Sequence, residues 1–342
     1  MVLEVSRSKI TQFGKDIPMK AIRINETGGP EVMQLEEVET PTPQEGEVLI
    51  KVAAAGVTQA DLAQRQGTYL TRTRTPMTLG MEVAGTVVAL GPGVSTPQEG
   101  TRVVSFVEGG YAEYASARAP MVIPIPPNLD FVHAATFPVQ GIMAYQLLRE
   151  LARLQPRESV LVYAAAGGVG TLAVQLARLM GAGIVISTAS TQNKLDLVRR
   201  LGADVAVNHN EHDWIEQVKE ANGGRGTDII LEMVGGKQAE QCLQCLAPFG
   251  RMVIYGRISG QNAQFSDVQL IYENQAIIGY WFTGWMSSRP DRTAVAAREL
   301  MQYLATAQLE IIAEHTFPLT EAAEAHRAIA QRKTTGEVVL LV

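Results

Sequence analysis

The chain has 342 residues, of which 46% are hydrophobic and 19% are charged. This length predicts one large or two ordinary domains with ample apolar core. The net charge of −6 and the lack of a basic stripe argue against a nucleic-acid partner, and no apolar run is long enough to span a membrane. The two cysteines, Cys242 and Cys245, cannot form a disulfide framework, which predicts a cytoplasmic protein whose thiols fill a buried helix.

The N-terminal half has the pattern of a β-rich domain. Residues 1–18 are polar, lack the apolar run of a signal peptide and are expected to form an extension. Thr58 and Asp61 form a capping box that predicts a short helix ending at Gln66. The other predicted elements are short strands between Gly- and Pro-rich turns, as in a partly open barrel, at 19–24, 32–38, 47–57, 83–90, 101–106 and 111–117.

The second half alternates strands and helices. Helical segments are predicted over residues 131–152, after a proline-rich boundary at 124–127. Six strands with crossover helices follow, which predicts an α/β fold with a doubly wound parallel sheet, at 160–162, 183–187, 205–208, 228–231, 251–255 and 276–281. The tail is expected to return to the N-terminal half through helices and strands at 292–307, 314–317, 320–331 and 337–341.

The turn after the first of these strands carries the pattern Gly168-x-Gly170-x-x-Ala173, which fits the dinucleotide-binding fingerprint. We expect Gly168 to take the backbone angles of the turn and Gly170 to let a pyrophosphate approach the backbone. Ala173 is small enough for close packing of helix on strand. The helix N-terminus offers N–H groups and a positive dipole end to the phosphates. The predicted cofactor residues here are Gly167, Gly168, Val169 and Gly170.

The next strand indicates which dinucleotide binds. NAD-binding folds usually place an Asp or Glu at its end, on the ribose 2′-hydroxyl. This chain instead has hydroxyl side chains and a lysine there, and we expect Ser187, Ser190 and Lys194 to hold a 2′-phosphate. Lys194 is equally compatible with a solvated lysine in the first turn of a helix. The pattern therefore favours NADPH over NADH.

Several motifs together resemble the zinc-free members of the medium-chain dehydrogenase/reductase family, in the zeta-crystallin-like quinone oxidoreductase branch. The resemblance runs from Met19 to Val342 and is carried by Ala55–Asp61, Gln66–Tyr69, Leu79–Gly85, Gly109–Tyr114, Ala164–Gly170 and Thr334–Leu340. It implies a GroES-like catalytic domain over residues 19–143 and 289–342, and a Rossmann NADPH-binding domain over 144–288. It also implies an active site in the cleft and a homodimer or homotetramer. The final strand, 276–281, is apolar and aromatic-rich and would be an exposed edge in a monomer, so we expect it near the interface.

The same comparison addresses a metal. Zinc-dependent relatives place a cysteine where Thr58 stands and a histidine where Met81 stands, and they carry a cysteine-rich lobe that this sequence lacks. Zinc requires several nitrogen or sulfur ligands, so no catalytic zinc is expected. Without this Lewis acid, hydride transfer to a conjugated carbonyl is easier than oxidation of an alcohol.

The resemblance also supplies candidate site residues. Tyr69 matches a family tyrosine that faces the nicotinamide and donates a proton in enoyl thioester reductases. Thr58 stands where the family commonly has an asparagine near the nicotinamide or substrate, and Met143 replaces a family threonine. Because both family residues are replaced, the resemblance does not define the polar contacts near the nicotinamide or substrate. Further cofactor residues implied by the resemblance are His209, Tyr255, Gly256, Arg257, Ile278, Gly279 and Tyr280.

The sequence thus predicts an NADPH-dependent enzyme that reduces quinones or other conjugated carbonyls (enones) without zinc. The segment Gly279–Trp285 is similar to one in enoyl thioester reductases, which makes a 2-enoyl thioester the alternative substrate. Its aromatic residues would equally fill a core or a dimer interface. A third hypothesis is an NADPH-binding crystallin-like or redox-sensing protein with little turnover.

Overall fold

The computed structural model describes residues 18–342, so the expected extension at 1–18 lies, except for Pro18, outside the described residues. The chain divides into two compact units, one formed by the residues up to Val139 together with Ala313–Val342, the other by Gln140–Ile312. The sequence predicts a return to the first domain at residue 289. In the structure α10 (Pro290–Ala305) packs against α3 (Ile142–Gln146), and the chain returns at Ala313.

The first unit is built on two mainly antiparallel sheets. Within the described residues they have the orders β15-β16-β3-β5-β6-β8, with β7 also paired to β3, and β2-β1-β4. Val48, Ile50 and Val52 alternate along β3 and join one core, as the two-residue period of a strand requires. The strands are β1 (Pro18–Ile24), β2 (Met33–Glu39), β3 (Glu47–Val57), β4 (Met77–Thr78), β5 (Glu82–Leu90), β6 (Arg102–Phe106), β7 (Tyr114–Arg118), β8 (Val122–Pro124), β15 (His315–Pro318) and β16 (Val338–Leu341).

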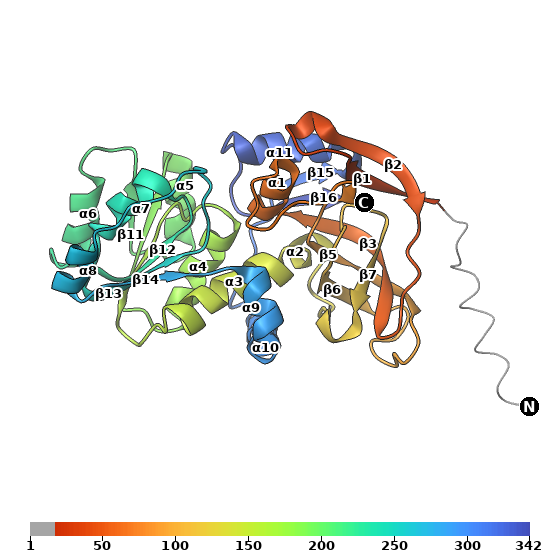
Figure 1. Ribbon diagram of the computed structural model, residues 1–342. Helices are drawn as coiled ribbons and strands as arrows, with labels where there is room; N and C mark the ends of the chain where they lie inside the picture. Colours follow the sequence, from red (N-terminus) through yellow and green to blue (C-terminus); the bar gives the residue numbers. More distant parts are fainter. Residues whose placement is uncertain (1–17) are drawn as a thin grey trace, which may run out of the picture. The chain divides into compact units, whose positions relative to one another are not determined.

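Short helices complete this unit. Thr58 caps the N-terminus of α1, and Gly67 ends the helix in the left-handed conformation at φ 74°. The C-terminal strand β16 pairs with the end of β3, Val338 opposite Val57, next to the start of α1. Figure 1 shows α1 and α11 close together. The helices and 3-10 turns are η2 (Pro30–Val32), α1 (Gln59–Gln66), η3 (Ala119–Met121), α2 (Phe131–Ala134), η6 (Leu319–Glu321) and α11 (Ala322–Ala330).

The second unit contains a six-stranded sheet in the order β11-β10-β9-β12-β13-β14, with all neighbours parallel. This confirms the predicted doubly wound sheet. All four residues of β9 are buried, as is typical of a parallel strand covered on both faces. The strands are β9 (Ser159–Val162), β10 (Ile184–Ala189), β11 (Val205–Asn208), β12 (Thr227–Glu232), β13 (Leu246–Ile254) and β14 (Ala276–Gly279).

One helical segment and one strand depart from prediction. The segment 131–152 is broken by the π-helical turns η4 and η5. The sixth strand ends at Gly279 and not at Trp281, because its partner β13 ends at Ile254, opposite Gly279. The chain then turns into α9. The helices are η4 (Phe137–Gly141), α3 (Ile142–Gln146), η5 (Leu147–Leu151), α4 (Gly168–Leu179), α5 (Gln192–Arg200), α6 (Trp214–Ala221), α7 (Gly236–Leu243), α8 (Asp267–Glu273), α9 (Phe282–Ser288) and α10 (Pro290–Ala305).

The two cysteines are buried, as predicted, but they do not share a helix. Cys242 lies on α7, which ends at Leu243, and Cys245 lies in the turn that leads into β13. Burial raises the pKa of the Cys242 thiol well above its usual value and that of Cys245 to about 12. The thiols are therefore neutral packing groups. Among residues 18–342, no helix combines the length and the apolar character needed to cross a membrane.

Candidate cofactor site and catalytic loop

The candidate cofactor residues of the second unit follow the carboxyl ends of its parallel strands. Val162 at the end of β9 pairs with Ser187 of β10 on one side and Leu231 of β12 on the other. Ile254, at the end of β13, pairs with Gly279 of β14. The strand order reverses at β9, the kind of position where open α/β sheets bind ligands. The structure thus brings the predicted loops to one edge of the sheet.

The backbone of the glycine turn differs from the prediction in its details. Gly168 does not take special turn angles, because it is the first residue of α4, and Gly167 before it is extended with φ −90° and ψ 179°. The left-handed residue of the turn is Ala164, with φ 52°. A non-glycine residue in this conformation is disfavoured by about 1–2 kcal/mol, so surrounding contacts must hold it.

Gly170 has a different role from the one predicted, whereas Gly167 has open space beside it. A Cβ atom added to Gly170 would lie 2.5 Å from the backbone oxygen of Ala165, so this glycine allows α4 to pack on its own turn. By contrast, no described atom lies within 4 Å of a Cβ built at Gly167. No side chain of the described residues caps α4. Open space at Gly167 beside uncapped N–H groups fits an incoming phosphate.

Ser187, one of the residues predicted to bind the 2′-phosphate, lies within β10. Ser187 is fully buried inside the sheet, so its hydroxyl is not exposed to a ribose phosphate. Ser190 and Lys194 are half-buried, just after the strand and in the first turn of α5. The neighbouring Thr188 is also fully buried, and its Oγ1 accepts a hydrogen bond from the backbone N–H of Ala164 at 2.9 Å.

His209 follows β11 and reaches back toward the turn. Its Nδ1 lies 3.2 Å from Thr188 Oγ1, and its ring packs on Tyr163 with centroids 5.1 Å apart. Its backbone N–H donates to the carbonyl oxygen of Ala189 at 3.1 Å. His209 therefore lies beside the glycine turn, joined to it through Thr188.

The predicted residues after β13 and β14 divide into buried and open positions. Arg257 is exposed and donates to Asn262 Oδ1 at 2.8 Å. Tyr280 is 8% exposed, and its hydroxyl donates to Gln146 Oε1 at 2.5 Å. The phenol of Tyr280 thus points into its own unit, and burial raises its pKa above the usual value. Gly279 is exposed and open to a ligand, as is Gly167.

Two further predicted positions, Tyr255 and Gly256, have structural roles. The Tyr255 backbone N–H donates to the carbonyl oxygen of Glu232 at 2.9 Å. Burial raises the pKa of its hydroxyl. A Cβ at Gly256 would lie 2.6 Å from the Met233 oxygen, which requires glycine there. Ile278 is half-buried on β14.

In the first unit, Thr58 is engaged in the capping box at the start of α1. Its Oγ1 donates to Asp61 Oδ2 at 2.7 Å and accepts from the Asp61 backbone N–H at 3.2 Å. Its own backbone N–H also donates to Asp61 Oδ2 at 2.7 Å. The hydroxyl proton of Thr58 is therefore directed at a carboxylate of its own helix.

Tyr69 lies three residues beyond Gln66, the last residue of α1. Gly67 terminates the helix, and its N–H bonds back to the Gln64 carbonyl at 3.0 Å. Tyr69 is half-buried, and the next residue, Leu70, is 68% exposed. The position of Tyr69 is thus set by how α1 is anchored.

A buried polar network anchors α1, and sequence reasoning missed it. The Arg65 Nε donates to His326 Nδ1 at 3.2 Å, and Arg65 Nη1 donates to the Gly28 carbonyl at 2.7 Å. Because a guanidinium only donates, His326 Nδ1 accepts and the ring proton sits on Nε2, facing Tyr111 Oη at 3.2 Å. Tyr111 in turn hydrogen-bonds to Asp61. The network thus joins α11 to both ends of α1.

Burial sets the protonation of this network. It raises the pKa of Asp61 to about 6, against the lowering effect of hydrogen bonds from Thr58 and Tyr111. It lowers the pKa of His326 to about 3, and the charge of Arg65 acts in the same direction. His326 is therefore neutral at physiological pH, which matches its role as an acceptor for Arg65.

The residues at the positions of the zinc ligands do not fit a metal. Thr58 is bound to Asp61, and Met81 is 6% exposed and offers only a thioether. In the part of the chain that the structure describes, no three His, Cys, Asp or Glu side chains gather as a metal site. No step of the reaction is therefore assigned to zinc.

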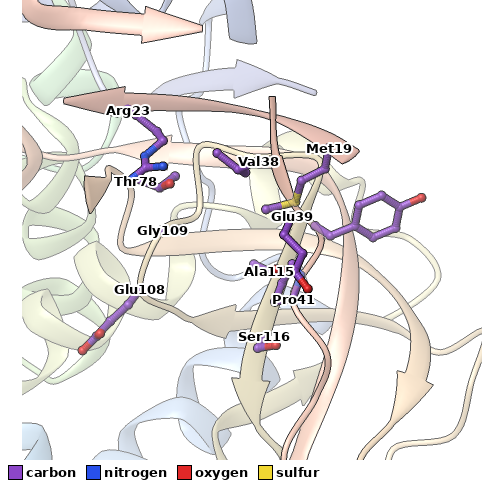
Figure 2. Close-up of a pocket in the computed structure, with 11 residues that line it drawn as sticks. Met19, Arg23, Val38, Glu39, Pro41, Thr78, Glu108, Gly109, Ala115 and Ser116 are labelled. Atoms are coloured by element: carbon purple, nitrogen blue, oxygen red, sulfur yellow. The ribbon is translucent and has the colours of Figure 1, made fainter. Parts of the chain in front are cut away.

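A cavity of about 300 Å³ also lies in the first unit (Figure 2). Met19 and Arg23 of β1, Val38 of β2 and Ser116 of β7 contribute to its lining. Neither Thr58 nor Tyr69 is among the lining residues, so the cavity is separate from the predicted catalytic loop.

Two family models match the chain. The alcohol dehydrogenase GroES-like domain matches residues 44–127, and the zinc-binding dehydrogenase model matches residues 168–299. The second match begins at Gly168, the first residue of α4, and covers strands β10 to β14, and it excludes Thr58 and Met81. The family name therefore carries no information about a metal at those two positions.

Relatives that align over nearly the whole chain identify the branch of the family. The chain is 35% identical over 328 residues to the quinone oxidoreductase of Homo sapiens, covering 95% of this chain and 98% of the relative. It is 33% identical over 330 residues to a 2-haloacrylate reductase of Burkholderia sp, covering 93% and 97%. The crystal structure of Escherichia coli quinone oxidoreductase complexed with NADPH matches with a TM-score of 0.88 and 31% identity, covering 94% of this chain and 100% of that chain. The chain therefore belongs to the medium-chain dehydrogenase/reductase superfamily, in its quinone oxidoreductase branch, and is an oxidoreductase.

Proposed function

We propose that this oxidoreductase reduces quinones with NADPH and without a metal ion. The observation that carries the proposal is the likeness over nearly the full length of both chains to quinone oxidoreductases, one of them complexed with NADPH. In this reaction one hydride and one proton convert the quinone to a hydroquinone, and NADPH becomes NADP⁺. The nicotinamide supplies the hydride, and the protein binds, orients and stabilises charge.

The described residues fit the cofactor at the carboxyl edge of the second sheet. The open face of Gly167 and the uncapped start of α4 suit its pyrophosphate. Ser190 and Lys194 lie after the neighbouring strand, where no acidic residue would repel a 2′-phosphate. His209 and Gly279 lie at the same edge. We assign the 2′-phosphate to Ser190 and Lys194 and leave the buried Ser187 out.

For the catalytic loop we assign Tyr69 as the hydrogen-bond donor to the substrate oxygen. Its phenol O–H is a hydrogen-bond donor that can stabilise negative charge developing on the substrate oxygen. Thr58 is a weaker candidate than the sequence suggested, because its proton already goes to Asp61. We therefore assign Thr58 to holding the start of α1.

A second candidate is reduction of a carbon–carbon double bond conjugated to a carbonyl. One relative is named a 2-haloacrylate reductase, and a 2-haloacrylate is such a compound. The segment Gly279–Trp285 is similar to one in enoyl thioester reductases, whose 2-enoyl thioester substrates are also of this kind. In the structure Tyr280 and Trp285 pack together with ring centroids 6.1 Å apart, which is also a plain packing role. A cofactor-binding protein with little turnover is the third possibility.

The test is a substrate panel combined with a binding measurement. NADPH oxidation is followed with quinones, 2-haloacrylate and 2-enoyl-CoA, and NADPH binding by fluorescence. We expect the highest kcat/KM with a quinone, unchanged after exhaustive chelation. Higher kcat/KM with an enoyl-CoA or haloacrylate supports the second candidate, and tight binding without turnover supports the third.

We also propose that the protein forms a homodimer through the β14 edge. Within the described residues β14 pairs only with β13, which leaves one side of the strand unpaired. The neighbouring helix α8 exposes Val268, Ile271 and Tyr272, each at least 70% accessible. Such a patch commonly marks an interface. Sedimentation of the wild type and of I271E distinguishes the cases: a dimer that the substitution dissociates supports this interface, and a 37.0 kDa monomer in both contradicts it.

A further inference from the structure

The turn that precedes α4 is held by a single residue of the neighbouring strand. The Ala164 N–H donates to Thr188 Oγ1 at 2.9 Å, and the next N–H, that of Ala165, donates to the Thr188 carbonyl at 2.8 Å. Just before them, the Tyr163 N–H donates to Leu231 of β12 at 3.1 Å. The chain therefore leaves its strand ladder at Ala164, and Thr188 takes over two consecutive donors.

The side-chain bond falls on the one residue of this turn that needs support. Ala164 is left-handed at φ 52° and has a Cβ atom, so its backbone favours other conformations when released. Thr188 is 0% exposed, so its hydroxyl is shielded from water that would compete for the bond. The hydroxyl thus opposes relaxation of Ala164.

The conformation of this turn is transmitted to α4 by direct backbone contact. A Cβ at Gly170 would lie 2.5 Å from the Ala165 oxygen and 2.7 Å from its carbonyl carbon, so the first turn of the helix rests on Ala165. Gly167, between the two, is the open position where a phosphate fits. A change at Ala164 therefore shifts the helix N–H groups that face the phosphate.

We propose that Thr188 is a positioning residue for the pyrophosphate of the dinucleotide, acting through the left-handed backbone of Ala164. Thr188 Oγ1 also lies 3.2 Å from His209 Nδ1, so the same hydroxyl connects the turn with the residue after β11. This assignment rests on the proposed binding of NADPH. Thr188 lies outside the glycine motif, but its hydroxyl holds the backbone of the turn in which the motif begins.

The first test measures binding and not turnover. NADPH, ADP-ribose and adenosine 2′-monophosphate are titrated calorimetrically against wild type and Thr188→Val, which has nearly the same shape without the hydroxyl. We expect Thr188→Val to weaken NADPH and ADP-ribose, which contain the pyrophosphate, about five- to tenfold, the effect of one hydrogen bond. Adenosine 2′-monophosphate, which has no pyrophosphate, should bind within about twofold of wild type.

The matched control is Thr227→Val. Thr227 is also a fully buried strand threonine whose Oγ1 hydrogen-bonds to the backbone. It donates to the Cys245 carbonyl at 3.3 Å and begins β12 at the opposite edge of the sheet. Its substitution should lower the melting temperature without the selective loss of affinity. Equal loss on ADP-ribose in both variants would show a general structural effect and overturn the proposal.

The sharper test is rescue by glycine. Ala164→Gly removes the steric penalty of the left-handed backbone, so Thr188→Val combined with Ala164→Gly should recover NADPH affinity to within about twofold of Ala164→Gly alone. If Thr188→Val does not fold, Ala164→Val replaces it and should show the same selective loss. Unchanged ADP-ribose affinity in a folded Thr188→Val, or no rescue, overturns the inference. Absence of NADPH binding in the wild type refutes the proposed function instead.

Discussion

The glycine turn of the second unit and the α1–Tyr69 segment of the first unit are positioned by different means. The turn is held by residues of adjacent parallel strands, with Thr188 and Leu231 bonding its backbone directly. The α1 segment is held by a buried chain of side chains in which Arg65 meets His326, 261 residues away. Apart from the Thr188 hydroxyl, the turn is bonded by backbone atoms and should tolerate most side-chain changes, whereas a buried polar network fails when one member is lost. The predictions below test this difference.

The largest expected effect is in the network of the first unit. His326→Leu leaves Arg65 Nε and the Tyr111 hydroxyl without the imidazole that each of them contacts, which should lower the free energy of unfolding by about 3–5 kcal/mol, the cost of two buried polar groups, one of them charged. His212→Leu is the control, because that side chain is 98% exposed, and should change stability by about 0.5 kcal/mol or less. Denaturant unfolding measures both. Equal effects would mean that the network does not support α1.

The glycine turn should show a contrast between two neighbouring glycines. Gly170→Ala forces a Cβ against the Ala165 backbone and should cost about 2–3 kcal/mol of stability. Gly167→Ala places its Cβ in open space and should leave stability within about 1 kcal/mol while weakening NADPH binding. Thermal unfolding and cofactor titration of both variants provide the measurement. The reverse order of stabilities contradicts the assigned roles.

The pH dependence of stability separates two members of the network. The pKa of His326 falls from 6.5 in the unfolded chain to about 3, so the unfolded state binds more protons in this window and stability rises with pH across it. The pKa of Asp61 rises from 3.8 to about 6, so the folded state binds more protons and stability falls as pH rises across that range.

Two variants isolate these opposing effects. The stability advantage of wild type over His326→Gln should grow as the pH is raised from about 4 to 6.5, and its advantage over Asp61→Asn should shrink over the same range. Urea unfolding at a series of pH values gives both differences. A difference between wild type and His326→Gln that stays constant with pH would show that His326 is not held neutral by the fold.

The smallest expected effect concerns cofactor choice at the edge of the second sheet. Lys194→Ala should weaken NADPH binding about tenfold, the size of one charge-assisted contact, and leave NADH binding nearly unchanged. Fluorescence titration of both cofactors tests this. Equal losses for the two cofactors would remove Lys194 from the 2′-phosphate site.

Much of the fold could be read from local patterns. The punctuation of short strands by Gly- and Pro-rich turns predicted β3, and the strand–turn–helix at 160–180 predicted the glycine turn, because both signals are local. The burial of Ser187 also had a signal, since the middle of a parallel strand is covered on both faces. The left-handed Ala164 had none, because that conformation is normally the mark of glycine.

The network around α1 could not be found from sequence for a different reason. His326 lies on α11 with the buried Ala322 and Ala325, so its inward position was readable from helical spacing. Which residue it meets depends on how the tail folds back onto the first unit. Periodicity gives a face and not a partner, so the contact with Arg65 required the structure.

Single-turnover oxidation of enzyme-bound NADPH by a 1,4-quinone, after exhaustive chelation, tests directly whether this protein catalyses quinone reduction without a metal. Bound NADPH should be oxidised at least about a hundredfold faster than free NADPH at the same quinone concentration, because both reactants are held in orientation. Tyr69→Phe should slow this step by less than about tenfold, the effect of one hydrogen bond. Oxidation of bound NADPH at the rate of the free cofactor would contradict catalysis and indicate a cofactor-binding protein.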